Sequence, residues 1–242
     1  MIGIGTIANV FAIVAGSLAG LFIKSGIPQK FRDTVMQALG LSVIVIGISG
    51  VLQGVYTITK HGNIERDHIM LMILSLVAGS ILGEILDLEL KLEKLAKWFQ
   101  NKFGNKDSSF VQGFVSTTLL YCVGAMAIVG SLEDGLFGSP DTLFAKSILD
   151  GISAVVFSAT LGIGVMFSSV PVALYQGSIT LLAIMIRPWL TDMVISQISL
   201  VGSVLIMAIG INLLKLTTIK VANMLPAVFV PLIYYIIMSF LG

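Results

Sequence analysis

Charged residues are scarce in this chain, and their scarcity excludes a water-soluble globular protein. Asp, Glu, Lys and Arg make up 11% of the 242 residues, whereas a soluble domain carries about 25%. Hydrophobic residues reach 56% and the mean hydropathy is +1.01, so too little polar surface remains to cover a soluble fold. The net charge of +1 offers no excess of positive charge for a nucleic acid.

Disulfides and catalytic motifs are also missing. The single cysteine, Cys122, excludes an intrachain disulfide framework. Neither H-E-x-x-H, nor G-x-S-x-G, nor a phosphate-binding glycine loop occurs, and His61 and His68 near Glu65 and Asp67 are weak candidates for a metal. We therefore predict no enzymatic activity, no cofactor and no metal ion. The first apolar segment lacks a basic n-region and an A-x-A site, so we expect it to be retained.

Long hydrophobic segments are what the sequence has in abundance. A bilayer core of ~30 Å takes about 20 apolar helical residues to cross. Lipid requires every backbone polar group to be paired within the protein, and the segments lack the alternation of barrel strands, so we expect helices. The predicted fold is all-α, a polytopic transmembrane helix bundle of about eight spans. The segments are 2–23, 35–54, 68–86, 112–132, 148–168, 171–188, 196–214 and 221–241.

The predicted organisation is a single transmembrane domain over residues 1–242, with one long polar interruption at 87–111. Spans 1–3 lie in 1–86 and spans 4–8 in 112–242. Within the interruption, apolar residues recur every three or four positions, at Leu88, Leu92, Leu95, Phe99 and Phe103. This pattern predicts an amphipathic helix suited to the cytoplasmic membrane surface. A helix that caps the ends of the spans is the alternative interpretation.

Basic residues in the loops predict the orientation. With eight spans, four Lys and Arg residues lie on one side of the membrane, namely Lys60, Arg66, Lys146 and Arg187. The other ten lie on the opposite side, in the loops after the first, third and seventh segments. The positive-inside rule then places the ten in the cytoplasm and both termini outside.

Two pairs of short motifs suggest internal repeats. Val14–Gly20 reads VAGSLAG and Val77–Gly83 reads VAGSILG, while LGIGV at Leu161–Val165 resembles IGINL at Ile209–Leu213. Repeated hairpins are typical of transporter folds, where segments interrupted by Gly or Pro point to the binding site. Chance similarity is the alternative, because the matches are short.

Ionisable residues inside the segments are candidates for a substrate or ion pathway, because charge is costly in lipid. Asp150 is expected about one turn inside the outer end of the fifth segment, as a cation ligand or proton acceptor. The alternative is a solvated i,i+4 pair with Lys146. Glu84 near the inner end of the third segment is either a gate or a carboxylate that reaches cytoplasmic water. An acidic outer loop is expected at Glu133, Asp134 and Asp141.

Four amides inside the segments complete the candidate pathway. They either bond helix to helix or together line an inward-facing vestibule, and they are Asn9, Gln176, Asn212 and Asn223. Gly162 and Gly164 belong to the pathway if Gly162–Pro171 is unwound at membrane depth. Alternatively, the chain turns tightly there and Pro171 opens the next helix. Pro226 and Pro231 predict a break or kink in the last segment.

Five stretches carry a resemblance to a known family. They are GTIAN (Gly5–Asn9), LLYCVGAMAIVGSLEDG (Leu119–Gly135), KSILDGISAVVFSATLGIGVMFSS (Lys146–Ser169), YQGSITLLA (Tyr175–Ala183) and KVANMLPA (Lys220–Ala227). Through nearly its whole length the chain resembles the bacterial integral membrane proteins grouped as the domain of unknown function 554 family. The resemblance implies a multi-pass protein of the bacterial inner membrane. It implies no activity, because the family is described as uncharacterised and sometimes as transport proteins.

These observations favour a small-solute or ion transporter or permease in the bacterial inner membrane. Its partners would be the lipid bilayer and an unidentified solute or ion, with no nucleic acid. The sequence is compatible with a homo-oligomer and does not require one. The alternative is a non-transporting membrane scaffold or sensor that uses the 87–111 helix as its platform.

Overall fold

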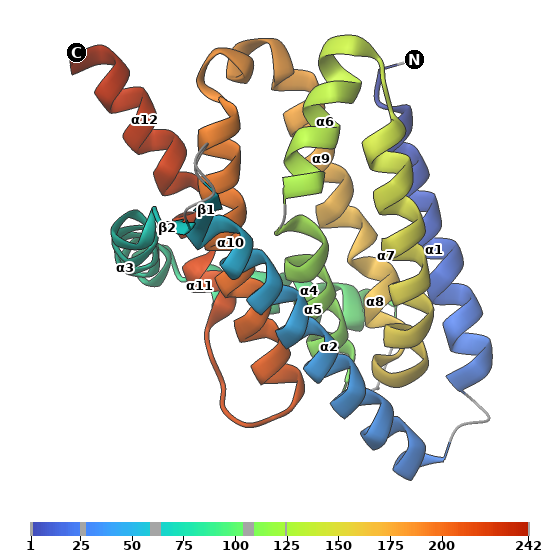
Figure 1. The fold of residues 1–242 in the computed structure, drawn as a ribbon. Helices are drawn as coiled ribbons and strands as arrows, with labels where there is room; N and C mark the ends of the chain where they lie inside the picture. Colours follow the sequence, from blue (N-terminus) through green and yellow to red (C-terminus); the bar gives the residue numbers. More distant parts are fainter. Residues whose placement is uncertain (1, 25–27, 59–63, 104–108, 124, 242) are drawn as a thin grey trace. The chain divides into compact units, whose positions relative to one another are not determined.

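The structure is a computed structural model that describes residues 2–24, 28–58, 64–103, 109–123 and 125–241. Helices dominate these residues, which confirms the all-α prediction, and a small antiparallel hairpin pairs β1 (Tyr56–Ile58) with β2 (Ile64–Arg66). The helices form two compact units (Figure 1). Unit 1 comprises Met1–Ala38, Leu90–Cys122 and Met126–Ile186, and unit 2 comprises Leu39–Glu89, Val123–Ala125 and Arg187–Gly242.

The number of candidate spans agrees with the prediction apart from one break. Within the described residues, seven helices are long and apolar enough to cross a membrane, or eight if one bent pair counts as a span. The pair is α5 (Phe110–Cys122) and α6 (Ala125–Phe137), which differ in direction by 60°. The predicted segment 112–132 is therefore a candidate span only as this bent pair. The sequence between the two helices offers only Gly124 as a signal, and glycine is common inside membrane helices.

In unit 1, α1 (Ile4–Lys24) packs along α7 (Asp141–Leu161) in the same direction (Figure 1). Gly5 lies beside Leu143, and fifteen residues later in both helices Gly20 lies beside Ser158. Between these contacts, a Cβ atom on Gly16 would overlap the carbonyl oxygen of Gly151. The small residues of α1 therefore let two helix backbones touch, as is typical of membrane helices.

The bent pair follows α7 in the opposite direction. Gly113 in α5 lies beside Leu161 at the end of α7, and Gly130 in α6 lies beside Leu143 near its start. Between these contacts Tyr121 meets Ser153. Together α5 and α6 thus extend along nearly the full length of α7.

A tight turn connects α7 to α9 (Ser169–Ile186). Gly162 ends α7 with φ +82°, a conformation that glycine adopts without strain, and the one-turn helix α8 (Gly164–Phe167) follows. Pro171 is the third residue of α9, within its first turn, as one of the two alternatives predicted. The other alternative, a long unwound stretch over Gly162–Pro171, was wrong, because the chain is helical again from Gly164.

The outward face of α9 is strongly apolar. Leu181 and Ile184 leave 82% and 78% of their surface exposed in the protein alone. Large exposed apolar side chains on a candidate span are suited to contact with lipid chains. The membrane-embedded helices thus imply contact with a bilayer.

The predicted amphipathic helix is α4 (Leu88–Lys102), most of which belongs to unit 1. Ala96 is fully buried in a cluster with Phe110, Phe114 and Phe167, against which Leu92 and Phe99 of α4 also pack. One face of α4 therefore caps α5 and α8, which supports the second interpretation of the sequence. The placement of α4 at the cytoplasmic membrane surface stays a prediction.

Unit 2 contains α3 (Ile69–Leu86), α10 (Asp192–Leu213) and most of α2 (Gln29–Val55), with the short η1 (Arg187–Trp189) before α10. The last segment is broken around its prolines, as predicted, into α11 (Val221–Met224), η2 (Leu225–Phe229) and α12 (Val230–Leu241). A Cβ atom on Gly83 in α3 would overlap the carbonyl oxygen of Asn223. Gly16 of VAGSLAG and Gly83 of VAGSILG thus each lie against the backbone of a neighbouring helix.

Candidate functional site

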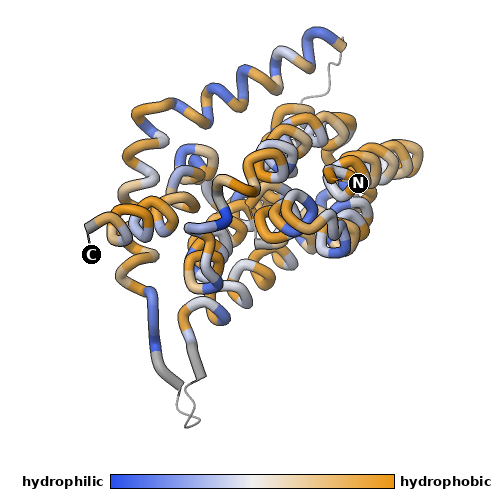
Figure 2. Tube along the Cα trace, turned by 90° about the horizontal axis from the view of Figure 1, so that it is seen from above, coloured by the Kyte–Doolittle hydropathy of each residue, from blue (hydrophilic) through white to orange (hydrophobic). Residues whose placement is uncertain are grey.

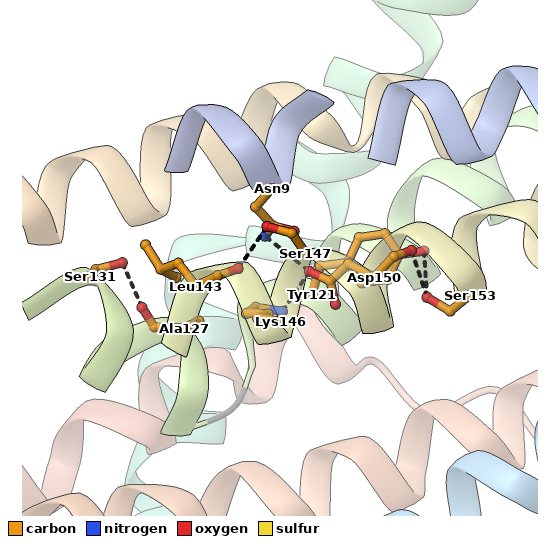
Figure 3. A network of polar contacts seen from close by, with 9 residues as sticks. All are labelled: Asn9, Tyr121, Ala127, Ser131, Leu143, Lys146, Ser147, Asp150 and Ser153. Carbon is orange, nitrogen blue, oxygen red and sulfur yellow. Dashed lines mark hydrogen bonds and ion pairs between the residues drawn. The ribbon is translucent and has the colours of Figure 1, made fainter. Parts of the chain in front are cut away.

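Asp150 is the centre of a buried polar network in unit 1 (Figure 3). Lys146 Nζ donates to Asp150 Oδ2 at 2.6 Å, and Asn9 Nδ2 donates to the same oxygen at 3.0 Å. The side chains of Lys146 and Asp150 are each only 9% exposed. The predicted i,i+4 pair is confirmed, whereas the expectation that solvent surrounds it was wrong.

The depth of Asp150 also differs from the prediction. Helix α7 has 21 residues and begins at Asp141, seven residues before the predicted span, so Asp150 is its tenth residue. At 1.5 Å per residue, Asp150 lies about 14 Å from the start of the helix, near its middle. The sequence was misleading because Asp141 and Lys146 resemble loop residues. An acidic residue is favourable in the first turn of a helix, and Lys146 is neutralised by Asp150.

The network continues to α5 through Tyr121, which is 1% exposed. Ser153 Oγ lies 3.1 Å from Tyr121 Oη and 2.9 Å from the carbonyl oxygen of Asp150 (Figure 3). Lys146 Nζ lies 5.8 Å from the centroid of the Tyr121 ring, within the range of a cation–π interaction. Since α5 ends at Cys122, one residue after Tyr121, the break in the bent pair begins beside the ion pair.

Gln176 is a second polar group at comparable depth, on α9. It is fully buried, and within the described residues neither its Nε2 nor its Oε1 has a hydrogen-bond partner. Asp150 lies 12 residues before Gly162, where α7 ends, and Gln176 lies 12 residues after Gly164, where the next span begins; each separation corresponds to about 18 Å of helix. We refer to Asn9, Tyr121, Lys146, Asp150 and Gln176 as the polar layer.

Other buried polar atoms of unit 1 also lack partners among the described residues. One is Oδ1 of Asn9, whose amide nitrogen bonds Asp150. The others are hydroxyl groups on α1, α5, α7 and α9, belonging to Thr6, Ser17, Thr118, Ser158 and Thr180. Most buried polar atoms in proteins bond to the chain, to ordered water or to a ligand. The interior of unit 1 therefore offers donors and acceptors to small polar molecules.

Three other candidates of unit 1 have structural roles. Gly162 forms the turn after α7, and Gly164 fits closely against the backbone of α5, where a Cβ atom would overlap the carbonyl oxygen of Phe110. Asp134 is fully buried, so its assignment to an outer loop was wrong. Its carboxylate accepts hydrogen bonds from the backbone N–H groups of Gly3 at 3.1 Å and Gly5 at 3.0 Å, and thus anchors the start of α1.

The remaining candidates lie in unit 2, where their amides are engaged by the protein. Asn223 Nδ2 donates to Glu84 Oε2 and Asn223 Oδ1 accepts from the backbone N–H of Glu89, both at 2.6 Å. Glu89 Oε2 in turn accepts the N–H of Ala222 at 2.8 Å, so α4 and α11 cap each other. Asn212 bonds both backbone groups of Ile219, at 2.7 and 2.8 Å, and closes the loop after α10.

Glu84 forms an exposed ion pair in unit 2. Lys220 Nζ donates to Glu84 Oε1 at 2.6 Å, and the two side chains are 61% and 55% exposed. The hydrogen bond to this carboxylate raises the pKa of Lys220 above its ordinary value of 10.5. Glu84 therefore reaches the protein surface, as a carboxylate that contacts water would have to.

The sequence interpretation did not identify Tyr121 or Ser153, and it placed Lys146 in an outer loop. The four-residue spacing of Lys146 and Asp150 was the available signal, because it places both side chains on one helix face. Tyr121 lies in an apolar run and offers no comparable pattern.

Comparison with known proteins identifies the family. A family model described as a protein of unknown function, DUF554, matches residues 4–236. The uncharacterized membrane protein YdfK of Bacillus subtilis (strain 168) is 33% identical over 237 residues, which cover 98% of this chain and 97% of the relative. The uncharacterized protein YqgA of Escherichia coli (strain K12) is 30% identical over 229 residues, covering 93% and 92%. No solved structure matches the chain. With bacterial relatives along nearly its whole length and seven or eight candidate spans, this multi-pass membrane protein belongs to the DUF554 family.

Proposed function

We propose that the protein transports a small solute or an ion across the bacterial inner membrane, and that the polar layer of unit 1 binds it. The supporting observation is the Lys146–Asp150 pair, buried near the middle of α7 at a depth comparable to that of the unpartnered amide of Gln176. An ionisable group inside a membrane span is costly, and such groups commonly mark transport pathways.

The surroundings of the pair support transport over a purely structural role. A buried ion pair gains little stability over well-packed apolar residues, because both charges lose their hydration. Small residues such as Gly16 also bring α1 and α7 into close backbone contact, so the polar bond from Asn9 is one of several contacts between these helices. The discontinuity after Cys122 adds a further feature that recurs at transporter binding sites.

The residues of the polar layer have distinct proposed roles. Asp150 is the coupling group, because a cation or proton that binds its carboxylate competes with the ammonium of Lys146. Asn9 and Gln176 contact the transported species through amide atoms that have no partner among the described residues, namely Oδ1 of Asn9 and both amide atoms of Gln176. Asn212 and Asn223 have no part in this proposal, since their amides are engaged in unit 2.

Flux through proteoliposomes tests the proposal. The full-length protein is reconstituted and assayed with a panel of ions and small metabolites, alongside Asp150→Asn and Gln176→Leu. We expect flux of at least one species, its loss in Asp150→Asn and its reduction in Gln176→Leu. Glu84→Gln is the matched control, since it neutralises a carboxylate outside the polar layer, and should retain flux. Full flux in Asp150→Asn would overturn the assignment of the site.

The scaffold or sensor alternative makes the opposite prediction in the same assay. A folded, reconstituted protein would then move none of the species, and its binding partners would be lost when the surface of α4 is altered.

The proposed orientation, with both termini outside, is tested separately by labelling single cysteines introduced near each end in intact cells. Labelling of both by an impermeant reagent is expected.

A further inference from the structure

One flank of α4 combines three lysines with two large apolar side chains. At 100° per residue, these five positions fall within an arc of about 100° beside the face that packs on unit 1. We call them the basic flank: Lys91, Lys94, Leu95, Trp98 and Lys102. The other flank of the helix carries Glu89, Glu93 and Gln100 instead. The helix is therefore asymmetric in charge.

All five residues of the basic flank are exposed, Trp98 by 52% and Leu95 by 39%. Lys102 Nζ lies 4.6 Å from the centroid of the Trp98 ring. Within the described part of the chain, the flank lysines form no ion pair with a carboxylate, whereas Lys97 outside the flank pairs with Glu93 at 3.4 Å. Three positive charges are thus left for an external anion.

The packing of α4 fixes the direction in which this flank points. Leu92, Ala96 and Phe99 hold the helix against Phe114 and Phe167, so it cannot rotate to bury the flank. In the view from above, α4 runs crosswise beside the helices of unit 1, with polar and apolar residues alternating along it (Figure 2). The basic flank is therefore a fixed outward surface.

Chain connections place α4 close to the ends of two candidate spans. Helix α4 begins two residues after the end of α3. Helix α5 begins eight residues after the end of α4. If α3 and the bent pair cross the bilayer, both ends of α4 are tethered close to its surface. Trp with Lys is the composition that favours this boundary, because the aromatic ring partitions to the headgroup level and basic groups attract lipid phosphates.

We propose that the basic flank of α4 binds the headgroups of anionic phospholipids. Lys91, Lys94 and Lys102 contact lipid phosphates, while Leu95 and Trp98 enter the boundary between headgroups and acyl chains. An acidic peptide is the less suitable occupant, since it would not use the two apolar side chains interleaved with the lysines. This inference does not depend on the proposed transport activity.

Fluorescence quenching by brominated lipids tests the inference on the full-length protein. The chain has two tryptophans, so Trp189→Phe leaves Trp98 as the sole reporter. This variant is reconstituted in bilayers with dibrominated phosphatidylglycerol or dibrominated phosphatidylcholine. We expect phosphatidylglycerol to be preferred at Trp98 by up to about a hundredfold, because each of the three lysines near an anionic surface strengthens binding about fivefold. High salt should weaken this preference.

Two triple variants of equal net charge test whether the preference for phosphatidylglycerol depends on the lysines of the basic flank. Added to Trp189→Phe, the substitutions Lys91→Gln, Lys94→Gln and Lys102→Gln should abolish the preference for phosphatidylglycerol. The matched control, Lys30→Gln, Lys97→Gln and Lys215→Gln, removes three exposed charges outside the flank and should retain it. Equal quenching by both lipids in the parent, equal losses in the two triple variants, or no quenching at all would each overturn the proposal. The last result would point to a protein partner.

Discussion

The two units use the same kinds of polar side chain in opposite ways. Within the described residues, nine buried side-chain nitrogen or oxygen atoms lack a hydrogen-bond partner, and eight belong to unit 1. The ninth is Ser75 Oγ in unit 2. In that unit, Asn212 and Asn223 use both ends of their amides to join loops and helices.

This difference shows that an amide inside an apolar segment can serve either helix-to-loop bonding or a candidate binding site, and that its position in the sequence does not decide which. Gln176 and Asn212 were equal candidates in the sequence. Both ends of the Asn212 amide are hydrogen-bonded, whereas the Gln176 amide has no partner among the residues that the structure describes. Unused hydrogen-bonding capacity is the property that a ligand-binding interior requires. The contrast therefore places the candidate site in unit 1, and four experiments can break or sharpen it.

The largest effect is expected from removing the carboxylate of the buried ion pair. Asp150→Ala leaves Lys146 buried without its partner and should destabilise the protein by about 3–5 kcal/mol. Glu84→Ala breaks an exposed pair and should lower stability far less. Heating the detergent-solubilised variants and measuring the fraction that stays monodisperse checks the difference. Equal losses of stability in Asp150→Ala and Glu84→Ala would show that the two ion pairs do not differ in their contribution to folding.

A double variant provides the control for Asp150→Ala. Lys146→Met combined with Asp150→Leu replaces both charges with apolar side chains of similar size, and should recover most of the lost stability. Recovery without flux would separate the transport role of the pair from its effect on folding.

The second experiment concerns packing, in which the two units should behave alike. Gly16→Ala and Gly83→Ala each place a Cβ atom against a backbone carbonyl oxygen and should each cost about 1–3 kcal/mol. Gly177→Ala is the matched control, because among the described residues no atom beyond its own stretch of helix lies within 4 Å of the added Cβ. The same heating assay applies. A loss in only one unit would show that the units differ in packing as well as in polar chemistry.

The third experiment compares one amide from each unit for its effect on stability and on flux. Asn212→Leu leaves the backbone groups of Ile219 without partners and should cost about 1–3 kcal/mol with little effect on flux. Gln176→Leu removes an amide that has no partner within the described part of the chain, so stability should stay equal or rise while flux falls. Unfolding and proteoliposome flux are measured on the same preparations. A clear loss of stability in Gln176→Leu would mean that the amide is satisfied in the folded protein.

The smallest effect is a pH dependence of the exposed pair in unit 2. The folded-state pKa of Lys220 is raised, so its stabilising contribution is complete below pH 10.5 and is lost as the pH rises through the folded-state value. Lys220→Gln should therefore be slightly less stable than the parent at neutral pH and equal to it in strong alkali. Comparing the two unfolding midpoints across this range tests the expectation. A difference that persists in strong alkali would assign it to packing of the lysine stem.

Composition and apolar length were sufficient to predict the helical membrane fold, because lipid permits few alternatives. Proline positions located the break in the last segment and the start of α9, since proline cannot donate a backbone hydrogen bond inside a helix. The break after Cys122 escaped prediction because the sequence between the two helices offers only Gly124 as a signal.

Several residues of the candidate site could be predicted from the sequence, but most of the contacts between them could not. Asp150 and Asn9 were identified as unusual residues, and the spacing of Lys146 indicated the ion pair. That Asn9 meets Asp150 depends on contact between helices 141 positions apart in the chain. Nor could composition distinguish Gln176 from Asn223, because the partners of Asn223 belong to two other helices.

The shared direction of α1 and α7 has a topological consequence. A chain reverses direction each time it crosses a bilayer, so an odd number of crossings must separate two parallel spans. Helices α2 and α3, each long enough to cross, provide two. The third then has to be α5 with α6, acting as one broken crossing. We therefore expect an even total of eight crossings, which returns the end of the chain to the side on which it began.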